Sequence, residues 1–397
     1  MDIKNTGEKM NFKIPWSIRS VLLNEQEIKT INAFLRSTEA LTQGAYKDAF
    51  ETKLKDYLDV EQGDIFAVNS GTSALELTAE LLEIKEGDEI ILPSHTFCAT
   101  AIPFLRRGAK LVWADIDPDT LVMSYEDVKK KITNKTKAII LVHLYGIPCD
   151  IDKFREFDIP LVEDAAQSFG AKYNNKKAGV LCDFGVFSFH AQKNLTTLGE
   201  GGALYVRDEE LAKKVAPLRM FGNKPFENQD KYWKPAMTNV TDVSNDLPYK
   251  YNMSEIQALV GILLLDRIDE LNSNRESMFW SFKEALSNYP DIVFQKIPFN
   301  ISSSYHLMPV KCMRNRDNII SRLIETYGIE MNVQYYPLNR YELFKKRGYG
   351  EANCPNTDLF FDNMMSFPFH EWMPAKDFNY MINATKETLD YTRTHQT

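Results

Sequence analysis

The stretch Gly185-Val-Phe-Ser-Phe-His-Ala-Gln-Lys-Asn-Leu-Thr-Thr-Leu-Gly-Glu-Gly-Gly202 places one lysine, Lys193, between two apolar runs. The runs are Val186 to Phe189 and Ala203 to Val206, and glycines precede the second. Such runs are typical of strands that enter and leave a buried layer. A lysine at the edge of that layer loses hydration, which lowers its pKa and makes its neutral amine a nucleophile. The alternative is a solvated lysine in a hairpin loop, which is the commoner situation.

Upstream of this stretch, short apolar runs alternate with helical patterns from residue 64 onward. Repeated strand–helix units with fully apolar strands favour an α/β fold, in which a mostly parallel sheet is covered by helices on both faces. We expect strands over 65–68, 90–92, 111–114, 138–144 and 160–162, and helices over 73–82, 99–105, 125–132 and 151–157.

The rest of the chain predicts an arm and a second domain. We expect an N-terminal arm over residues 1–25, a large domain over 26–265 and a smaller α+β C-terminal domain over 266–397. A capping box of Ser254 and Gln257 predicts one long helix from Ser254 to Leu271. Residues 221–250 are polar and turn-rich but carry aromatic side chains, which favours a functional loop over a solvated linker.

Composition narrows the class of protein. The 397 residues include 47 basic and 55 acidic side chains, for a net charge of −8, which does not favour nucleic acid or an anionic membrane as a partner. The five cysteines are widely spaced and indicate reduced core thiols, with no metal site. No apolar leader or membrane span is visible, so we expect a cytoplasmic protein.

Two motifs at predicted strand ends have features of a ligand site. Asn69-Ser-Gly-Thr-Ser-Ala74 joins a strand to a helix, where Thr72, Ser73 and free N–H groups could hold a phosphate, although an ordinary helix cap is the alternative. Pro93-Ser-His-Thr-Phe-Cys-Ala-Thr100 would bring Phe97 or His95 to the sheet edge as a stacking ring, unless the ring only packs.

A third motif, Leu161-Val-Glu-Asp-Ala-Ala-Gln-Ser168, places two carboxylates directly after a buried strand. Neighbouring side chains in a strand point in opposite directions, so only one of them can face a ligand crevice. The alternative is an acidic helix start. Together, a phosphate cradle, a stacking ring, a carboxylate and a desolvated lysine are what pyridoxal 5′-phosphate (PLP) requires.

The sequence also resembles the DegT-type sugar aminotransferases, which are fold-type I PLP enzymes. The resemblance covers nearly the whole chain, except that Gly44-Ala45 replaces a common Gly-Pro turn and residues 221–247 match nothing. The motifs that carry it are Asn69-Ser-Gly-Thr-Ser-Ala, Pro93-Ser-His-Thr-Phe, Val142-His-Leu-Tyr-Gly, Val162-Glu-Asp-Ala-Ala-Gln-Ser, Ser188-Phe-His-Ala-Gln-Lys-Asn-Leu-Thr-Thr, Gly199-Glu-Gly-Gly, Asn252-Met-Ser-Glu-Ile-Gln-Ala, Ser304-Tyr-His-Leu and Ser366-Phe-Pro-Phe-His370.

The resemblance implies a role for individual residues. Lys193 would form the Schiff base with PLP and move the proton during transamination. Asp164 would pair with the pyridine nitrogen, Gln167 with the ring hydroxyl, and Phe97 would stack on the ring. Thr72, Ser73 and Ser188 would hold the phosphate. Lys250, followed by Asn252, would complete the phosphate site across the interface of a homodimer.

The activity implied is transfer of an amino group from L-glutamate, or glutamine, to a keto-sugar, most often nucleotide-linked, in amino-sugar or surface-polysaccharide biosynthesis. The cofactor would alternate between PLP and its pyridoxamine form. Two alternatives stay open: a PLP-dependent sugar dehydratase, against which Lys193 argues because such relatives carry histidine there, and a PLP-binding regulator without turnover. We expect residues 221–250 to select the sugar.

Overall fold

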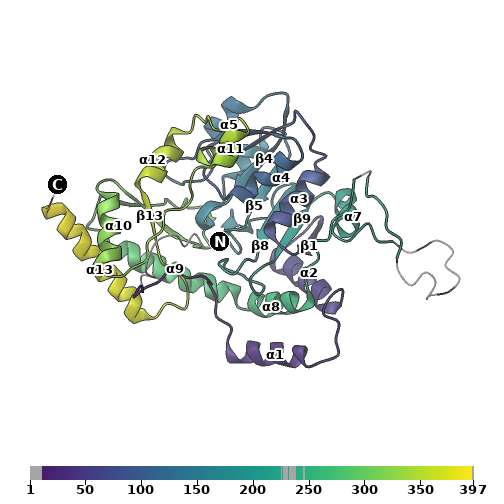
Figure 1. The fold of residues 1–397 in the computed structure, drawn as a ribbon, viewed down its shortest axis with the longest axis horizontal. Coiled ribbons are helices and arrows are strands. Elements are labelled where there is room, and N and C mark those ends of the chain that lie inside the picture. Colours follow the sequence, from purple (N-terminus) through teal and green to yellow (C-terminus); the bar gives the residue numbers. More distant parts are fainter. Residues whose placement is uncertain (1–10, 225, 227–230, 232–237, 245, 396–397) are drawn as a thin grey trace.

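The structure of the chain, a computed structural model, describes residues 11–395 except for 225, 227–230, 232–237 and 245 (Figure 1). Its strands are β1 Asp64–Val68, β2 Glu89–Pro93, β3 Lys110–Ala114, β4 Thr136–Val142, β5 Leu161–Asp164, β6 Lys172–Tyr173, β7 Lys176–Lys177, β8 Phe184–Ser188, β9 Gly202–Val206, β10 Ile292–Phe294, β11 Ile301–Ser302, β12 Met308–Cys312 and β13 Met364–Phe367.

The helices alternate with these strands in the first half of the chain and dominate the second. They are α1 Glu25–Leu35, α2 Ala45–Tyr57, α3 Gly71–Leu81, α4 Ile102–Arg106, α5 Tyr125–Lys131, α6 Ile151–Arg155, α7 Glu209–Leu218, α8 Glu255–Leu265, α9 Ile268–Ala285, α10 Arg316–Glu325, α11 Glu342–Lys346, α12 Pro355–Asn363 and α13 Ala375–Thr394. Short 3₁₀ turns lie at Cys98–Thr100, Leu144–Gly146 and Leu338–Arg340.

A seven-stranded sheet forms the centre of the molecule, in the order β1-β9-β8-β5-β4-β2-β3. The pairs from β8 to β3 are all parallel, whereas β9 runs antiparallel to both β8 and β1. The predicted α/β fold with a mostly parallel sheet is therefore confirmed. Because β9 alone is reversed, the loop from β8 to β9 turns back at the edge where the parallel strands end.

Both faces of this sheet are buried, as fully apolar strands require. In β1, Phe66 and Val68 pack in one core with residues of α3 and α7, while Ile65 and Ala67 pack in a second core with residues of α2 and α8. Alternate side chains of one strand thus reach opposite helical layers. Figure 1 shows α3 and α2 near the β1 edge of the sheet.

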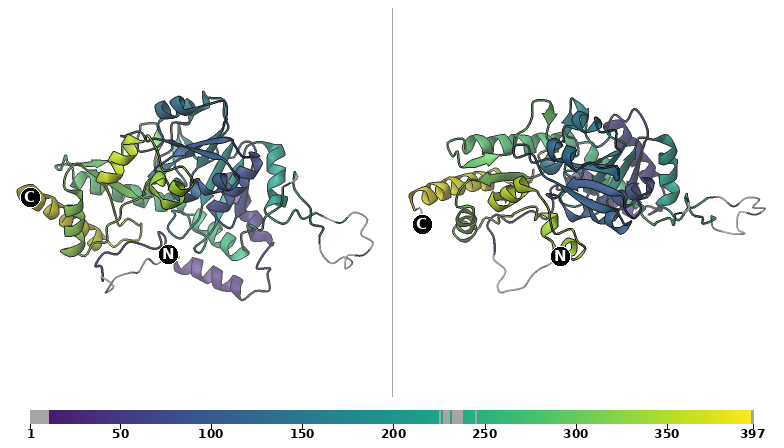
Figure 2. Two further views of the ribbon diagram at one scale, coloured as in Figure 1. Left: turned by 45° about the horizontal axis from the view of Figure 1, so that its top comes forward. Right: turned by 90° about the horizontal axis from the view of Figure 1, so that it is seen from above.

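A smaller sheet, β10-β12-β13, forms a second centre with its own core. Phe282 of α9, Leu323 of α10 and Met381 of α13 are fully buried in this core. Figure 2 shows α10 and α13 at the opposite end of the molecule from α7. The sequence predicted an α+β unit here without the bounds of its elements, which the structure supplies.

The single long helix predicted from Ser254 to Leu271 is wrong. Two helices replace it, because the chain leaves the helical conformation at Arg267, where φ is −125° and ψ is 15°. The Arg267 guanidinium donates to the Glu27 carboxylate at 2.6 Å and to the Leu22 carbonyl at 2.6 Å. Contacts to a distant part of the chain leave no trace in local periodicity. The predicted start is confirmed, with the Ser254 N–H donating to Gln257 Oε1 at 3.0 Å.

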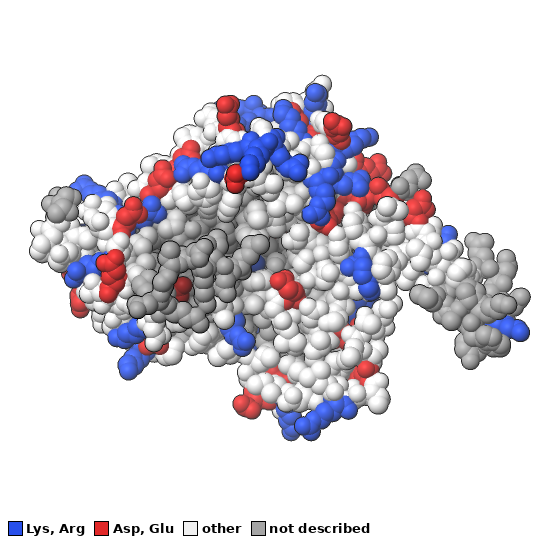
Figure 3. Space-filling model, viewed as in Figure 1, with Lys and Arg blue, Asp and Glu red and all other residues white. Residues whose placement is uncertain are grey.

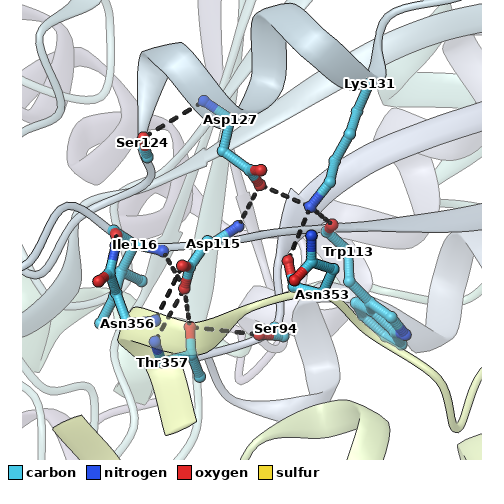
Figure 4. Close-up of polar contacts among 10 residues, drawn as sticks. All are labelled: Ser94, Trp113, Asp115, Ile116, Ser124, Asp127, Lys131, Asn353, Asn356 and Thr357. Atoms are coloured by element: carbon cyan, nitrogen blue, oxygen red, sulfur yellow. Dashed lines mark hydrogen bonds and ion pairs between the residues drawn. The ribbon is translucent and has the colours of Figure 1, made fainter. Parts of the chain in front are cut away.

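The C-terminal half is fixed to the central sheet by a buried carboxylate at the end of β3 (Figure 4). Asp115 accepts hydrogen bonds from the backbone N–H groups of Asn356 at 2.9 Å and Thr357 at 2.8 Å. These groups belong to the first turn of α12, so Asp115 caps that helix from a different element. Asp127 accepts from the Asp115 N–H at 2.7 Å and from Lys131 at 2.6 Å, which extends the network to α5.

Replacing Asp115 by alanine is expected to lower the free energy of unfolding by about 2 kcal/mol, the upper end for a lost helix cap, because the α12 donors stay buried. Denaturant unfolding, monitored by fluorescence, measures this loss of stability. Asp117→Ala, two residues on, removes an acidic side chain that bonds only within its own turn to residues 119 and 120, and serves as the control. Equal effects of the two substitutions would contradict the capping role.

The face in Figure 3 carries basic and acidic side chains side by side, with Lys and Arg gathered at the top of the view over α5 and α11. The last turn of α5 contains Lys129 and Lys130, and the last turn of α11 contains Lys345 and Lys346. Positive charge is favoured at the C-terminal end of a helix. Among the described residues, no helix combines the length and the apolarity needed to cross a lipid bilayer.

Candidate active site

The carboxyl-terminal edge of the central sheet carries most of the predicted site residues. Thr72 and Ser73 follow β1, Phe97 follows β2, Asp164 ends β5, and Ser188 ends β8. Lys193 lies in the loop from β8 to β9, which returns at this same edge. Parallel strands present their loops on one side, so the topology gathers residues from distant parts of the sequence.

Lys193 is held by a tight turn, in which its N–H donates to the His190 carbonyl at 2.8 Å. Burial lowers the pKa of Lys193 from 10.5 to about 8, and the negative charge of Asp164 opposes part of this shift. At pH 7 about a tenth of its amine is therefore uncharged, far more than for an ordinary lysine, and a nucleophile or a proton carrier needs this neutral form.

Asp164 faces the site from the end of β5 and is almost completely buried. Its Oδ2 accepts a hydrogen bond from the Thr100 hydroxyl at 2.7 Å, and its Oδ1 accepts from the Ala166 N–H at 3.2 Å. Each carboxylate oxygen has a further lone pair, so Asp164 can accept one more proton donor from a ligand.

The neighbouring Glu163 points to the other side of the strand, as predicted for adjacent strand residues. It accepts from His143 Nε2 at 2.9 Å and from the backbone N–H groups of Gly179, Leu181 and Cys182 at 2.6 to 2.8 Å. Burial alone would raise the pKa of Glu163, but these hydrogen bonds hold it below its ordinary value. Glu163 therefore supports the fold, and only Asp164 is available to a ligand.

The start of α3 provides a turn of helix open to an anion. Ser70 is the N-cap, and its hydroxyl accepts from the Ser73 N–H at 3.0 Å. The Ser73 hydroxyl is buried and lies 2.8 Å from that of Ser70, whereas Thr72 is exposed. A Cβ added at Gly71 would lie 3.0 Å from Ser188 Cβ, so the glycine lets the helix approach the end of β8. Thr72, Ser73 and Ser188 are thus close together.

Tyr335, which the sequence analysis missed, joins several predicted residues. Its hydroxyl lies 3.3 Å from Gln167 Nε2, and its ring meets that of Phe97 edge-on, with 6.1 Å between the ring centres. It also lines a pocket with Lys193. Phe97 is 55% exposed and free to cover a flat ligand. Gln167 Oε1 accepts from the Tyr145 N–H at 3.0 Å, which fixes the amide.

His95, the other stacking candidate, is fully buried beneath the site. Its Nε2 lies 2.8 Å from the Tyr145 hydroxyl, and its ring packs edge-on against Phe360. Burial lowers the pKa of His95 to about 3, so the imidazole is neutral. His95 packs behind the pocket, and Phe97 is the ring that a ligand can reach.

Lys250 is not brought to the other site residues within one chain. Its side chain is exposed, and its ammonium lies 3.1 Å from Met220 Sδ and 5.7 Å from the ring of Phe221. Asn252 instead pairs with Val68, beside the start of α3. Asn252 Oδ1 is buried without a hydrogen-bond partner among the described residues. Much of the predicted sugar-selecting loop, 221–250, lies outside the described residues.

The N-terminal arm also reaches the site, which its mixed composition did not predict. Trp16, Ser17, Arg19 and Ser20 line the pocket beside Lys193, together with His306. The Ser20 N–H donates to the Ala191 carbonyl at 3.0 Å. Among the described residues, no group of three or more His, Cys, Asp or Glu side chains could hold a metal ion.

Comparison with known proteins gives one consistent result. The model of the DegT/DnrJ/EryC1/StrS aminotransferase family matches residues 22–386. The spore coat polysaccharide biosynthesis protein SpsC of Bacillus subtilis is 30% identical over 398 residues, which cover 96% of this chain and 98% of SpsC.

Solved structures agree with this match. The putative sugar aminotransferase Spr1654 of Streptococcus pneumoniae, in its PMP form, has a TM-score of 0.85 and 29% identity, covering 96% of this chain and 98% of its own. The aminotransferase PseC of Helicobacter pylori, involved in the biosynthesis of pseudoaminic acid, has a TM-score of 0.85 and 25% identity, covering 95% and 99%. Spr1654 is also known in a PLP form.

Proposed function

Since the chain belongs to the DegT/DnrJ/EryC1/StrS aminotransferase family, we propose that it transfers an amino group from L-glutamate or L-glutamine to a nucleotide-linked keto-sugar. It is a PLP-dependent sugar aminotransferase. Lys193, at the same sheet edge as Asp164 and with a pKa lowered by burial, carries the proposal. The product would serve amino-sugar or surface-polysaccharide biosynthesis in the cytoplasm.

The residues at the sheet edge fit PLP. Asp164 keeps a free lone pair for a ring N–H, Thr72 is exposed on the first turn of α3, and the buried Asn252 Oδ1 lacks a partner there. When bound, PLP supplies an aldehyde that takes up the amino group and a ring that withdraws electrons from the donor Cα. The chain itself must hold the ring, keep its nitrogen protonated and move a proton.

Each of these tasks has a candidate residue. Asp164 would accept the ring N–H and keep that nitrogen positively charged. Gln167 would bind the ring hydroxyl through the Nε2 group that it directs towards Tyr335, and Phe97 would cover the ring face. Thr72, Ser73 and Ser188 would hold the phosphate at the α3 N-terminus. The Lys193 amine would take the proton from the donor Cα and deliver it to C4′ of the cofactor.

The placement of Lys250 supports a proposal about the assembly. Its exposed ammonium contacts Met220 and is not among the residues that line the Lys193 pocket of its own chain. We propose a homodimer in which Lys250 completes the phosphate site of the partner, while Asn252 stays beside the start of α3 in its own chain. Lys250→Ala would then weaken cofactor binding without changing the environment of Lys193.

The test of the proposed activity uses the cofactor as its own indicator. L-Glutamate or L-glutamine added to PLP-loaded protein should convert the absorbance to that of the pyridoxamine form. The pyridoxamine form should then pass labelled nitrogen from ¹⁵N-glutamate to a nucleotide-linked keto-sugar, detected by mass spectrometry. No absorbance change with any amino donor would reject the proposal. Loss of water from the sugar without gain of nitrogen would favour the dehydratase.

The rate at which the protein without cofactor captures PLP should depend on pH through Lys193. The protonated lysine is not nucleophilic, so capture is slow below the pKa and speeds up as the amine is deprotonated. The rate should therefore rise with pH and level off above about 8, rather than near the ordinary 10.5. Stopped-flow absorbance measures it. A rate that keeps rising towards the ordinary lysine pKa would show that Lys193 is solvated.

A further inference from the structure

The N-terminal arm forms one wall of the Lys193 pocket and is anchored at both ends. On one side, Gln192 Nε2 donates to the Ser17 carbonyl at 3.1 Å. On the other, the Trp16 N–H donates to Glu330 Oε2 at 2.6 Å, and Trp372 Nε1 donates to the Arg19 carbonyl at 3.3 Å. The arm backbone is therefore fixed between the lysine loop and the small domain.

The backbone of Arg19 helps to anchor the arm, but no hydrogen bond of its side chain to a described residue is seen. Arg19 is exposed at the pocket, and no described acidic residue forms an ion pair with its guanidinium. Among the described residues that line the pocket there is no Asp or Glu. An exposed arginine among the residues that line a pocket, without an acidic partner there, attracts an anionic ligand.

Two other lining residues, His306 and Lys193, could in principle carry a positive charge that binds the anion, but neither is a permanent cation. Burial, together with the charges of Lys193 and Arg275, lowers the pKa of His306 well below its ordinary value, so this imidazole is neutral. Lys193 itself has its pKa lowered to about 8 and is the reacting amine. Arg19 is thus the permanent positive charge among the lining residues.

We propose that Arg19 binds a carboxylate of the amino donor and so orients the donor Cα towards Lys193. This rests on the proposed aminotransferase function. An amino acid that reacts at Lys193 carries its α-carboxylate one bond from the reacting carbon, and glutamate carries a second carboxylate. The planar guanidinium can donate two parallel hydrogen bonds to such a group. Arg19 is a positioning residue, because the proton moves through Lys193.

The test compares Arg19→Gln and Arg19→Lys with wild type and with Lys13→Gln. Lys13 is an exposed cation on the same arm, but it lies over the ring of Tyr380, outside the pocket. Single-turnover absorbance of the PLP-loaded protein gives the half-saturating L-glutamate concentration and the limiting rate. Calorimetric titration with glutarate, a dicarboxylate without an amine, measures binding independently of turnover.

Arg19→Gln should raise the half-saturating glutamate concentration and the glutarate dissociation constant about 10- to 100-fold, the loss of charge-assisted hydrogen bonds. Arg19→Lys should restore part of this, and Lys13→Gln should behave as wild type. With L-glutamine, an unchanged Arg19→Gln variant assigns the side-chain carboxylate, and a weakened one assigns the α-carboxylate.

Wild-type affinity of Arg19→Gln for both glutamate and glutarate would overturn the inference, as would weakened binding confined to the nucleotide-linked sugar. These outcomes are distinct from failure of the proposed function, in which the wild-type protein itself responds to no amino donor.

Discussion

Replacing Lys193 by alanine is expected to slow amino transfer from the donor by about 10²–10⁴-fold or more, because the pocket loses its proton-transferring amine. The lowered pKa of Lys193 provides a neutral amine at neutral pH, which water at the same position cannot replace. Single-turnover absorbance of the loaded protein with saturating L-glutamate measures the loss. Added methylamine should restore part of the rate, since a small amine fits the space of the missing side chain.

Lys177→Ala is the matched control, because Lys177 is also a lysine whose pKa is lowered by burial. Its ammonium lies 3.8 Å from the centre of the Tyr57 ring and 3.5 Å from Asp269, outside the Lys193 pocket. The control should retain the wild-type rate. A Lys193→Ala protein that keeps its absorbance change with glutamate would assign the chemistry to another residue.

Asp164→Asn is expected to lower the same rate by about 10²–10³-fold, in the range found when one preorganised electrostatic contact is lost. The amide can still accept a hydrogen bond, but it carries no charge to keep the ring nitrogen protonated. The side chain is buried, so water cannot substitute for it. The limiting rate should fall while the amount of bound cofactor changes little, which absorbance and cofactor release after denaturation measure separately.

Its neighbour gives a direct control. Glu163→Gln removes the same charge one residue away, yet Glu163 faces His143 and the backbone of residues 179–182. We expect the folded variant to react at the wild-type rate and to lose about 1–3 kcal/mol of stability, because buried donors lose a charged acceptor. If both substitutions slowed the reaction equally, the effect would be a general loss of structure.

The fold could be predicted because its signals are local. Each central strand is a short apolar run buried on both faces, so its pattern does not depend on which neighbour it pairs with. The site residues that were predicted share this property: Thr72, Asp164 and Ser188 stand next to a strand end, and the topology alone brings them to one edge. The same reasoning predicted that Glu163 and Asp164 would point apart.

The residues that were missed reach the site through tertiary contacts. Tyr335 and Arg19 lie far from the central strands in sequence, and neither is part of a helix or strand. The break at Arg267 depends on Glu27, more than two hundred residues earlier. Lys250 was assigned to the phosphate from a resemblance, and within its own chain it contacts Met220. Periodicity reports on neighbours along the chain, so it carries no signal for such contacts.

The pairing of β1 with β9 can form only late while the chain is being synthesised. β1 is made early, but its partner, in which Gly202 pairs with Val68, emerges only after the parallel strands between them. Long-range pairings of this kind are slow and leave strand edges exposed until they close. The pocket is completed later still, because two of its lining residues, Tyr335 and Phe369, are near the end of the chain. The complete pocket therefore forms only when nearly the whole chain has been made, and a chain that ends before Tyr335 would carry the lysine without this pocket to lower its pKa.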